Sequence, residues 1–286
     1  MLFNIKKTNT TGRPYIWKKK VMQSLNFTLL LLVFSLFNCS SVSNIKNTSI
    51  PIDHTVFDNL LKKHVAVDGA VNYKGFIEDK VEFEKYLTLL KNNHPNKRNW
   101  SKEEQLAYWI NAYNAFTVKL IIDHYPVKSI KDIKSGVVFV NSVWDIKFIN
   151  IEEQEYDLNN IEHGIIRKEF DEPRIHFAVN CASYSCPRLR NEAFIAEKLE
   201  AQLEDQTRKF FNDTRKNQII SKDKIILSSI LKWYSTDFTE KGFLSRLFGG
   251  NGRSEKLIRF VNPYVDIDIS KNAEVEFMDY RWDLNE

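Results

Sequence analysis

Residues 101–126 of the chain, SKEEQLAYWINAYNAFTVKLIIDHYP, decide its fold. Ser101 stands three residues before Glu104, which is the spacing of a capping box at the start of a helix. Pro126 cannot continue a helix, so the helix should end before it. Between these two ends, apolar residues cover most of the helical circumference. The stretch therefore predicts a long helix buried at the centre of a domain.

Shorter periodic segments flank this helix. Apolar residues at helical spacing predict further helices at 57–64, 83–90, 158–167 and about 191–211. Strand-like runs predict a hairpin of 143–148 with 154–156, a hairpin of 219–220 with 225–227, a buried strand at 175–179 and a closing strand at 275–280. The glycines of 249–252 predict a surface loop. Helices and hairpins interleave without repeated βαβ units, so we expect an α+β fold: a central buried helix packed on a small antiparallel sheet, with surrounding helices.

The composition excludes several classes of protein. Of the 286 residues, 43% are hydrophobic and 27% are charged, as in an ordinary globular protein. The net charge of +4 comes partly from lysines 18–20, and without them the domain is close to neutral. No nucleic-acid partner is therefore expected. Three cysteines are too few for a disulfide scaffold, so the hydrophobic core must hold the fold.

The N-terminal 39 residues have the pattern of an export signal. Lysines 18–20 precede the apolar run 27–37, which is shorter than the roughly 20 apolar residues of a stable membrane span. Cys39 closes this run, and two serines follow it, which resembles a bacterial lipobox, although Asn38 is larger than the residue usual there. We expect lipid attachment at Cys39. A plain cleaved signal with an incidental cysteine, and a start at Met22, are the alternatives.

This leader implies a domain organisation and a location. Residues 1–39 form the signal segment, residues 40–54 a polar tether, and residues 55–286 one globular domain. The lipid would bind the membrane and hold the domain in the bacterial cell envelope, at the periplasmic face of the outer membrane. That compartment is oxidising, so the two remaining cysteines can be bridged or free.

Residues 176–187, HFAVNCASYSCP, carry most of the candidate chemistry. Cys181 or Cys186 can act as a thiolate nucleophile if a base lowers its pKa and a third group orients that base. His163 or His176 is the candidate base. Glu162 or Asn111 is the candidate orienting group, with Asn114 as a further choice. Asn111 and Asn114 share a face of the central helix, where bonding to neighbouring backbone is the more common role.

Three other roles compete for the same residues. Cys181 and Cys186 are five residues apart and can close a disulfide ring in an oxidising compartment. Either cysteine can instead be a small core residue. The third role is a zinc site, which needs His163, His176, Cys181 and Cys186 to converge; the residue types suit zinc, but the spacing of His176 and the two cysteines matches no standard zinc pattern. Metal is therefore the less favoured role, and no cofactor is expected. The histidines at 54, 64, 94 and 124 lie among residues typical of exposed segments and indicate no site.

Several motifs together carry a family resemblance: VNYKG at 71–75, YWINAYNA at 108–115, IEHGIIR at 161–167, PRIHFA at 173–178, SCP at 185–187 and DYRWDLN at 279–285. With these motifs, the chain from about residue 55 resembles the family of domain of unknown function 547. That resemblance implies a single domain, found in bacterial envelope proteins and, fused to other segments, in plants and animals. It implies no agreed activity. Asn180 departs from the hydrophobic or variable residue expected there.

Two functional hypotheses follow. The first is a thiol-dependent hydrolase or transferase acting on amide or ester bonds, with Cys181 or Cys186 as nucleophile and His163 as base. The second is a binding or structural module, non-catalytic, with a Cys181–Cys186 disulfide. Because His163 precedes Cys181, a papain-like arrangement would have to be permuted or use other residues. The ligand in either case is an unknown small molecule or peptide.

Overall fold

The computed structural model describes residues 47–134, 142–239 and 252–286. All described residues belong to one compact unit, 44–286. The predicted signal segment with Cys39, and residues 249–251 of the predicted loop, lie outside the described residues. Within the described ranges, every helix is too short or too polar to cross a membrane.

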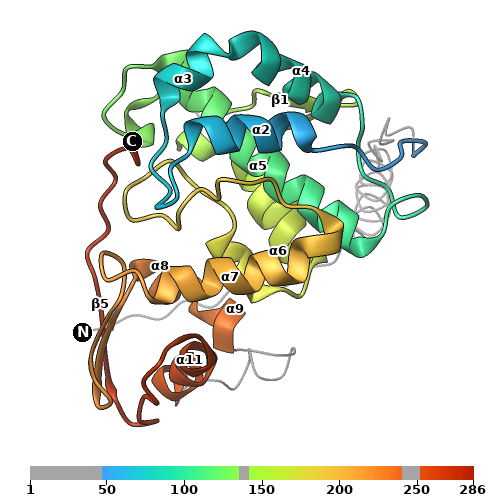
Figure 1. The fold of residues 1–286 in the computed structure, drawn as a ribbon. Coiled ribbons are helices and arrows are strands. Elements are labelled where there is room, and N and C mark those ends of the chain that lie inside the picture. Colours follow the sequence, from blue (N-terminus) through green and yellow to red (C-terminus); the bar gives the residue numbers. More distant parts are fainter. Residues whose placement is uncertain (1–46, 135–141, 240–251) are drawn as a thin grey trace, which may run out of the picture. The chain divides into compact units, whose positions relative to one another are not determined.

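The predicted central helix is α5, Lys102–His124. Its capping box is present: the Ser101 hydroxyl accepts from the Glu104 amide at 3.1 Å, and the Glu104 carboxylate accepts from the Ser101 amide at 2.6 Å. Most of its side chains are buried around the whole circumference, and it runs through the middle of the helical region in Figure 1. A helix apolar on all sides is stable only when other elements cover every face.

Three helices and a hairpin pack around α5: α2 (Thr55–His64), α3 (Tyr73–Glu78), α4 (Lys80–Lys91), and β1 (Ile149–Ile151) with β2 (Gln154–Tyr156). Their contacts are largely aromatic. Phe57 of α2 stacks on Tyr86 of α4 with ring centroids 4.7 Å apart, and Phe76 meets Phe83 at 5.3 Å. The largest fully buried side chains of this core are mostly aromatic rings.

A second, smaller core surrounds Phe177. It is built from α7 (Leu199–Phe211), α8 (Ser229–Trp233), α9 (Ser235–Thr239), α11 (Arg253–Val261) and the strands β3 (Gln218–Ser221), β4 (Lys224–Leu227) and β5 (Glu274–Phe277). The Phe177 ring lies 4.7 Å from that of Phe210 and 5.7 Å from that of Phe238. Because His176 precedes Phe177, this core sets the position of the histidine.

The three-stranded sheet has the order β3-β4-β5. β3 pairs with β4 as the predicted antiparallel hairpin, whereas β5 pairs with β4 in parallel, with Val275 opposite Ile225. After β5 the chain runs back along the edge of the domain to end near α3 (Figure 1). On the way, Leu284 pairs with Ser183, and the Asn285 carbonyl accepts from the Val71 amide.

The α+β class is confirmed, while three predicted segments are wrong in detail. Residues 175–179 are not a strand: Pro173–Phe177 form the short helix η4, which begins with a proline and is capped by Glu172. Residues 143–148 contain the helical turn η2, Val143–Asp145, and the strand begins only at Ile149. A short apolar run fits a strand and a buried helical turn equally well, which explains both errors.

The third error concerns the start of the long helix before Phe211. It begins at Leu199, after the turn η5 (Ala196–Lys198), rather than near residue 191. The Gln202 side chain binds the backbone of Ala193 and Ile195 and holds that segment extended. The predicted helix at 158–167 is present as the π-helical η3, Asn160–Ile166, followed by α6, Arg167–Glu169. The remaining short helices are η1 (Ile130–Asp132) and η6 (Asn262–Tyr264).

Candidate functional site

A cavity of about 310 Å³ lies where the two cores meet. Its walls come from α5, η2, η3, η4, the loop after η4, α8 and the chain after β5. The residues that line it are Tyr113, Trp144, Asn159, Glu162, His163, His176, Val179, Cys181, Cys186, Pro187, Ile230, Trp233, Tyr234, Tyr280 and Trp282. The cavity thus contains five of the six residues predicted for the site.

The loop that carries both cysteines is held by buried amides. The backbone N–H of Asn180 donates to the Asn114 side chain at 2.8 Å. The Asn180 side chain donates to the Pro187 carbonyl at 2.6 Å and accepts from the Ala182 amide at 2.9 Å. Ala182 itself has a φ of 58°. Asn180, unexpected in the family resemblance, thus ties the two ends of the loop together.

The two sulfur atoms are neighbours. Both thiols are free, and Cys186 Sγ lies 2.9 Å from Cys181 Sγ. Cys186 is buried and Cys181 is partly exposed. The Cys181 sulfur also lies 3.2 Å from the Ser183 hydroxyl and 3.3 Å from the Tyr280 hydroxyl. Cys186 and the hydroxyls of Ser183 and Tyr280, which lie 2.8 Å from each other, therefore surround one sulfur.

This arrangement shifts the pKa values of the two thiols in opposite directions. The hydrogen bond from Cys186 lowers the pKa of the Cys181 thiol, and those from Ser183 and Tyr280 add to it, against the raising effects of burial and of Glu162. Burial raises the pKa of the Cys186 thiol well above its usual range. Hydrogen bonds to the ionised form favour ionisation, while a low-dielectric environment opposes it. Of the two thiols, Cys181 is therefore the more easily ionised, and Cys186 is placed to donate a hydrogen bond to it.

His176 is oriented by a carboxylate that the sequence analysis missed. Its Nε2 lies 2.7 Å from Oδ2 of Asp237 in α9, and its ring stacks on Tyr234 at 4.2 Å. Arg167 donates to both oxygens of the same carboxylate, at 2.7 and 2.9 Å. Burial would raise the pKa of Asp237, but the hydrogen bonds from His176 and Arg167 outweigh it and hold that pKa well below its usual range. Within the described residues, Nδ1 of His176 has no hydrogen-bond partner.

His163 and Glu162 lie on η3 at the same cavity. Nδ1 of His163 accepts from Arg167 at 3.1 Å and lies 3.8 Å from the Glu162 carboxylate. His163 is exposed, while the side chain of Glu162 keeps only 9% of its accessible surface. Burial, and then Glu162, raises the pKa of the Tyr234 hydroxyl far above its usual range. No imidazole of the described residues hydrogen-bonds to a sulfur.

Asn111 has a different role from the one proposed for it. Its amide donates to the Phe194 carbonyl at 2.7 Å and accepts from the Phe194 amide at 3.0 Å. Asn111 does not line the cavity. Its polar groups instead hold the extended segment before α7, which is the backbone-bonding role that the sequence analysis weighed for it.

The cavity partners that the sequence analysis missed come from far along the chain. Asp237 is 61 residues from His176, and Tyr280 is 99 residues from Cys181. Tyr280 and Trp282 do lie in the DYRWDLN motif, which marked the segment without assigning it a role. Asp237 had no such signal, because nothing in its local sequence distinguishes it from a surface carboxylate.

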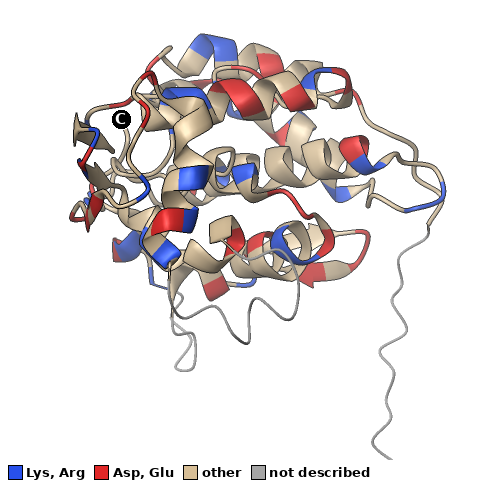
Figure 2. Ribbon diagram, turned by 90° about the horizontal axis from the view of Figure 1, so that it is seen from below, with Lys and Arg blue, Asp and Glu red and all other residues tan. Residues whose placement is uncertain are grey.

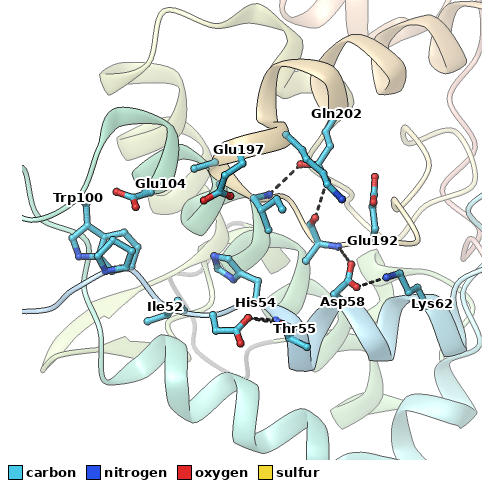
Figure 3. A pocket seen from close by; sticks show the side chains of 17 residues that line it. Ile52, His54, Thr55, Asp58, Lys62, Trp100, Glu104, Glu192, Glu197 and Gln202 are labelled. Carbon is cyan, nitrogen blue, oxygen red and sulfur yellow. Dashed lines mark hydrogen bonds and ion pairs between the residues drawn. The ribbon is translucent and has the colours of Figure 1, made fainter.

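A second cavity, of about 350 Å³, lies between α2 and the start of α7 (Figure 3). Several of its polar groups bind one another: Asp58 accepts from the Ala193 amide and from Lys62, and Gln202 donates to the Ala193 carbonyl. It contains no cysteine. Buried His54 lies on its floor with Nδ1 2.7 Å from the Tyr86 hydroxyl. These contacts indicate a structural junction.

Two observations bear on the ligands that the domain can bind. Figure 2 shows basic and acidic residues interspersed over the described helices in that view. Among the described residues, no group of three or more histidine, cysteine or carboxylate side chains is arranged to hold a metal ion.

Together these features define an α+β domain with a thiol pair in an aromatic cavity. The model of the family described as "Protein of unknown function, DUF547" matches residues 97–211. The chain therefore carries a domain of that family, as the motifs predicted, and the matched segment includes both cysteines, Glu162, His163 and His176. No curated protein and no solved structure matches the chain significantly.

Proposed function

We propose that this domain is a thiol-dependent hydrolase or transferase of amide or ester bonds, with Cys181 as its nucleophile. The environment of the Cys181 sulfur is the observation that supports this proposal most. The sulfur faces a cavity, and hydrogen bonds from Cys186, Ser183 and Tyr280 stabilise its thiolate. A stabilised thiolate open to a ligand cavity is the requirement for covalent catalysis by cysteine.

His176 is the base that the geometry favours. Asp237 holds its Nε2, so the ring is fixed with Nδ1 as the nitrogen available to the cavity. A carboxylate that orients an imidazole and stabilises its cationic form is the logic of the catalytic triad. His163 fits the role less well. Arg167 can only donate to its Nδ1, so the proton of the neutral ring sits on Nε2, which then donates rather than accepts.

The reaction balances with these groups alone. Cys181 gives its proton to Nδ1 of His176 and attacks the carbonyl carbon. A C–S bond forms, and the C–N or C–O bond breaks. The leaving amine or alcohol takes a proton from the His176 imidazolium. Water or an amine then attacks the thioester, gives its proton to His176 and releases the Cys181 thiolate. Hydroxyls of Ser183 and Tyr280 can donate to the developing oxyanion once the sulfur no longer holds the charge.

The second candidate is a binding or structural module in which Cys181 and Cys186 form a disulfide. The contact of 2.9 Å between their sulfur atoms favours it. In this case neither sulfur is a nucleophile, and the aromatic cavity serves binding alone.

The location is proposed from the leader. Lysines 18–20, the apolar run 27–37 and Cys39 support export and lipid attachment in a bacterial envelope. The lipid would hold the domain against the membrane at the periplasmic face. Incorporation of a labelled fatty acid into the wild-type chain, and its loss in Cys39→Ala, is the expected result. Equal labelling of both proteins argues against the anchor.

Intact-protein mass spectrometry with an activated ester, such as p-nitrophenyl acetate, tests the enzyme hypothesis. We expect one acyl group on Cys181, released by hydroxylamine, and no adduct in Cys181→Ser. The variant His176→Ala should acylate at least 100-fold more slowly. His124→Gln, at the exposed end of α5, is the matched control and should acylate at the wild-type rate. A natively folded protein with no free thiol under non-reducing conditions would favour the disulfide module instead.

A further inference from the structure

One side of the cavity is a cluster of aromatic rings. The Tyr280 ring lies 4.5 Å from that of Trp282 and 4.8 Å from that of Trp233. Trp144 adds a third indole, 5.5 Å from Trp282. Trp233 is 49% exposed, although indoles are usually buried in cores. An exposed indole beside a cavity is available for a ligand.

Few charged side chains line the cavity itself. Glu162 is the only carboxylate among the described residues that line the cavity, and no lysine or arginine lines it. The Glu162 side chain is about nine-tenths buried, since only 9% of it is exposed. Its carboxylate lies 3.8 Å from Nδ1 of His163 and also interacts with the Tyr234 hydroxyl. Among the described residues, no lysine or arginine forms an ion pair with Glu162, although Arg167 lies near enough for the charge of Glu162 to raise its pKa, so a cationic ligand can pair with this carboxylate.

We propose that the cavity binds an alkylammonium group of the substrate, held by the Glu162 carboxylate and by the aromatic rings of Trp233, Tyr280 and Trp282. The inference rests on the proposed function and adds its substrate class: amides, esters or acyl acceptors that carry a cationic amine. Aromatic faces attract ammonium ions, most strongly when the ion is desolvated. The Trp282 ring already has one cation over it, since Lys131 Nζ lies 4.7 Å from its centroid.

Such binding would also activate the nucleophile. The charge of Glu162 raises the pKa of the Cys181 thiol. A cation bound at Glu162 offsets that charge, so the Cys181 thiolate becomes more populated when the substrate is present. The free protein would then hold a less reactive thiol than the complex. Cation binding and Cys181 reactivity are therefore expected to change together.

The binding test uses two probes of the same shape. Choline carries the cation, and 3,3-dimethyl-1-butanol is its neutral isostere. Calorimetry on the Cys181→Ser protein measures binding without catalysis. We expect choline to bind at least 10-fold more tightly, Glu162→Gln to lose most of that preference, and Trp233→Ala to weaken choline binding. Glu169→Gln, which removes an exposed carboxylate on α6 outside the cavity, is the matched control and should bind as the parent does.

The reactivity test uses wild-type protein. Choline should move the pH profile of Cys181 alkylation to lower pH, and Glu162→Gln should abolish that movement. Equal affinity for choline and its isostere, or tighter binding of a neutral sugar such as methyl glucoside, would overturn the inference. The wild-type comparison remains decisive if Glu162→Gln does not fold.

The two proposals fail in different ways. If choline binds but Cys181 is never acylated, the cation-site proposal stands and the proposed enzymatic function is refuted. If Cys181 is acylated but choline binds no more tightly than its neutral isostere, the proposed enzymatic function stands and the cation-site proposal is refuted.

Discussion

Acid should destabilise this domain through His54, and the size of the effect can be worked out. His54 is buried at the start of α2, and that burial lowers its pKa to about 4. An unfolded histidine has a pKa of about 6.5, so the shift is about 2.5 units, at about 1.4 kcal/mol each. Between these pH values the unfolded chain binds the additional proton, so the free energy of unfolding rises with pH. His54 should therefore cost about 3 kcal/mol of stability as the pH falls from 7 to 4.

Urea denaturation at half-unit pH steps measures this effect by comparing wild type with His54→Gln. The difference between the two removes the contributions of all other groups. We expect wild type to lose about 3 kcal/mol more than the variant across this range. Tyr86→Phe is the control: it removes the hydrogen bond to His54 but keeps the burial, so its pH dependence should follow wild type. Parallel curves for wild type and His54→Gln would refute the argument.

Three further predictions concern the site and the second core. Asp237→Asn should lower the rate of Cys181 acylation by at least 100-fold while the protein stays folded, because His176 loses its orienting carboxylate. A wild-type rate in a stopped-flow assay would exclude a catalytic role for the contact between His176 and Asp237. Phe177→Ala should reduce the free energy of unfolding by about 3–5 kcal/mol, measured in urea, and a loss under 1 kcal/mol would contradict its central place in the second core. Asn217→Ala should cost about 1–3 kcal/mol in the same measurement, because it leaves the Ser228 amide and the Phe210 carbonyl without their buried partner.

The fold was most predictable where local signals agree. Helix α5 has a capping box at one end, a proline after the other and apolar residues on every face, and it was predicted within a residue or two. Residues 175–179 had only a short apolar run, so the same pattern fitted a strand and η4. The parallel pairing of β5 depends on contacts between distant segments, which periodicity does not report.

The site was predictable in part for the same reason. Cys181, Cys186 and His176 lie within one short stretch, and their types suggested the chemistry. Asp237 joins them only because the second core brings α9 against η4. His54 was misjudged because its polar neighbours in sequence suggested exposure, whereas tertiary contacts with Tyr86 bury it.

The central claim is that Cys181 is a stabilised thiolate in a ligand cavity. The most direct test is the rate of alkylation by iodoacetamide as a function of pH, with the modified residue identified by peptide mass spectrometry. We predict that Cys181 reacts first, with an apparent pKa below the value of about 8.5 for a free cysteine, and that Cys186 stays unmodified in the folded protein. Preferential alkylation of Cys186, or an apparent pKa of Cys181 above that of a free cysteine, would contradict the account.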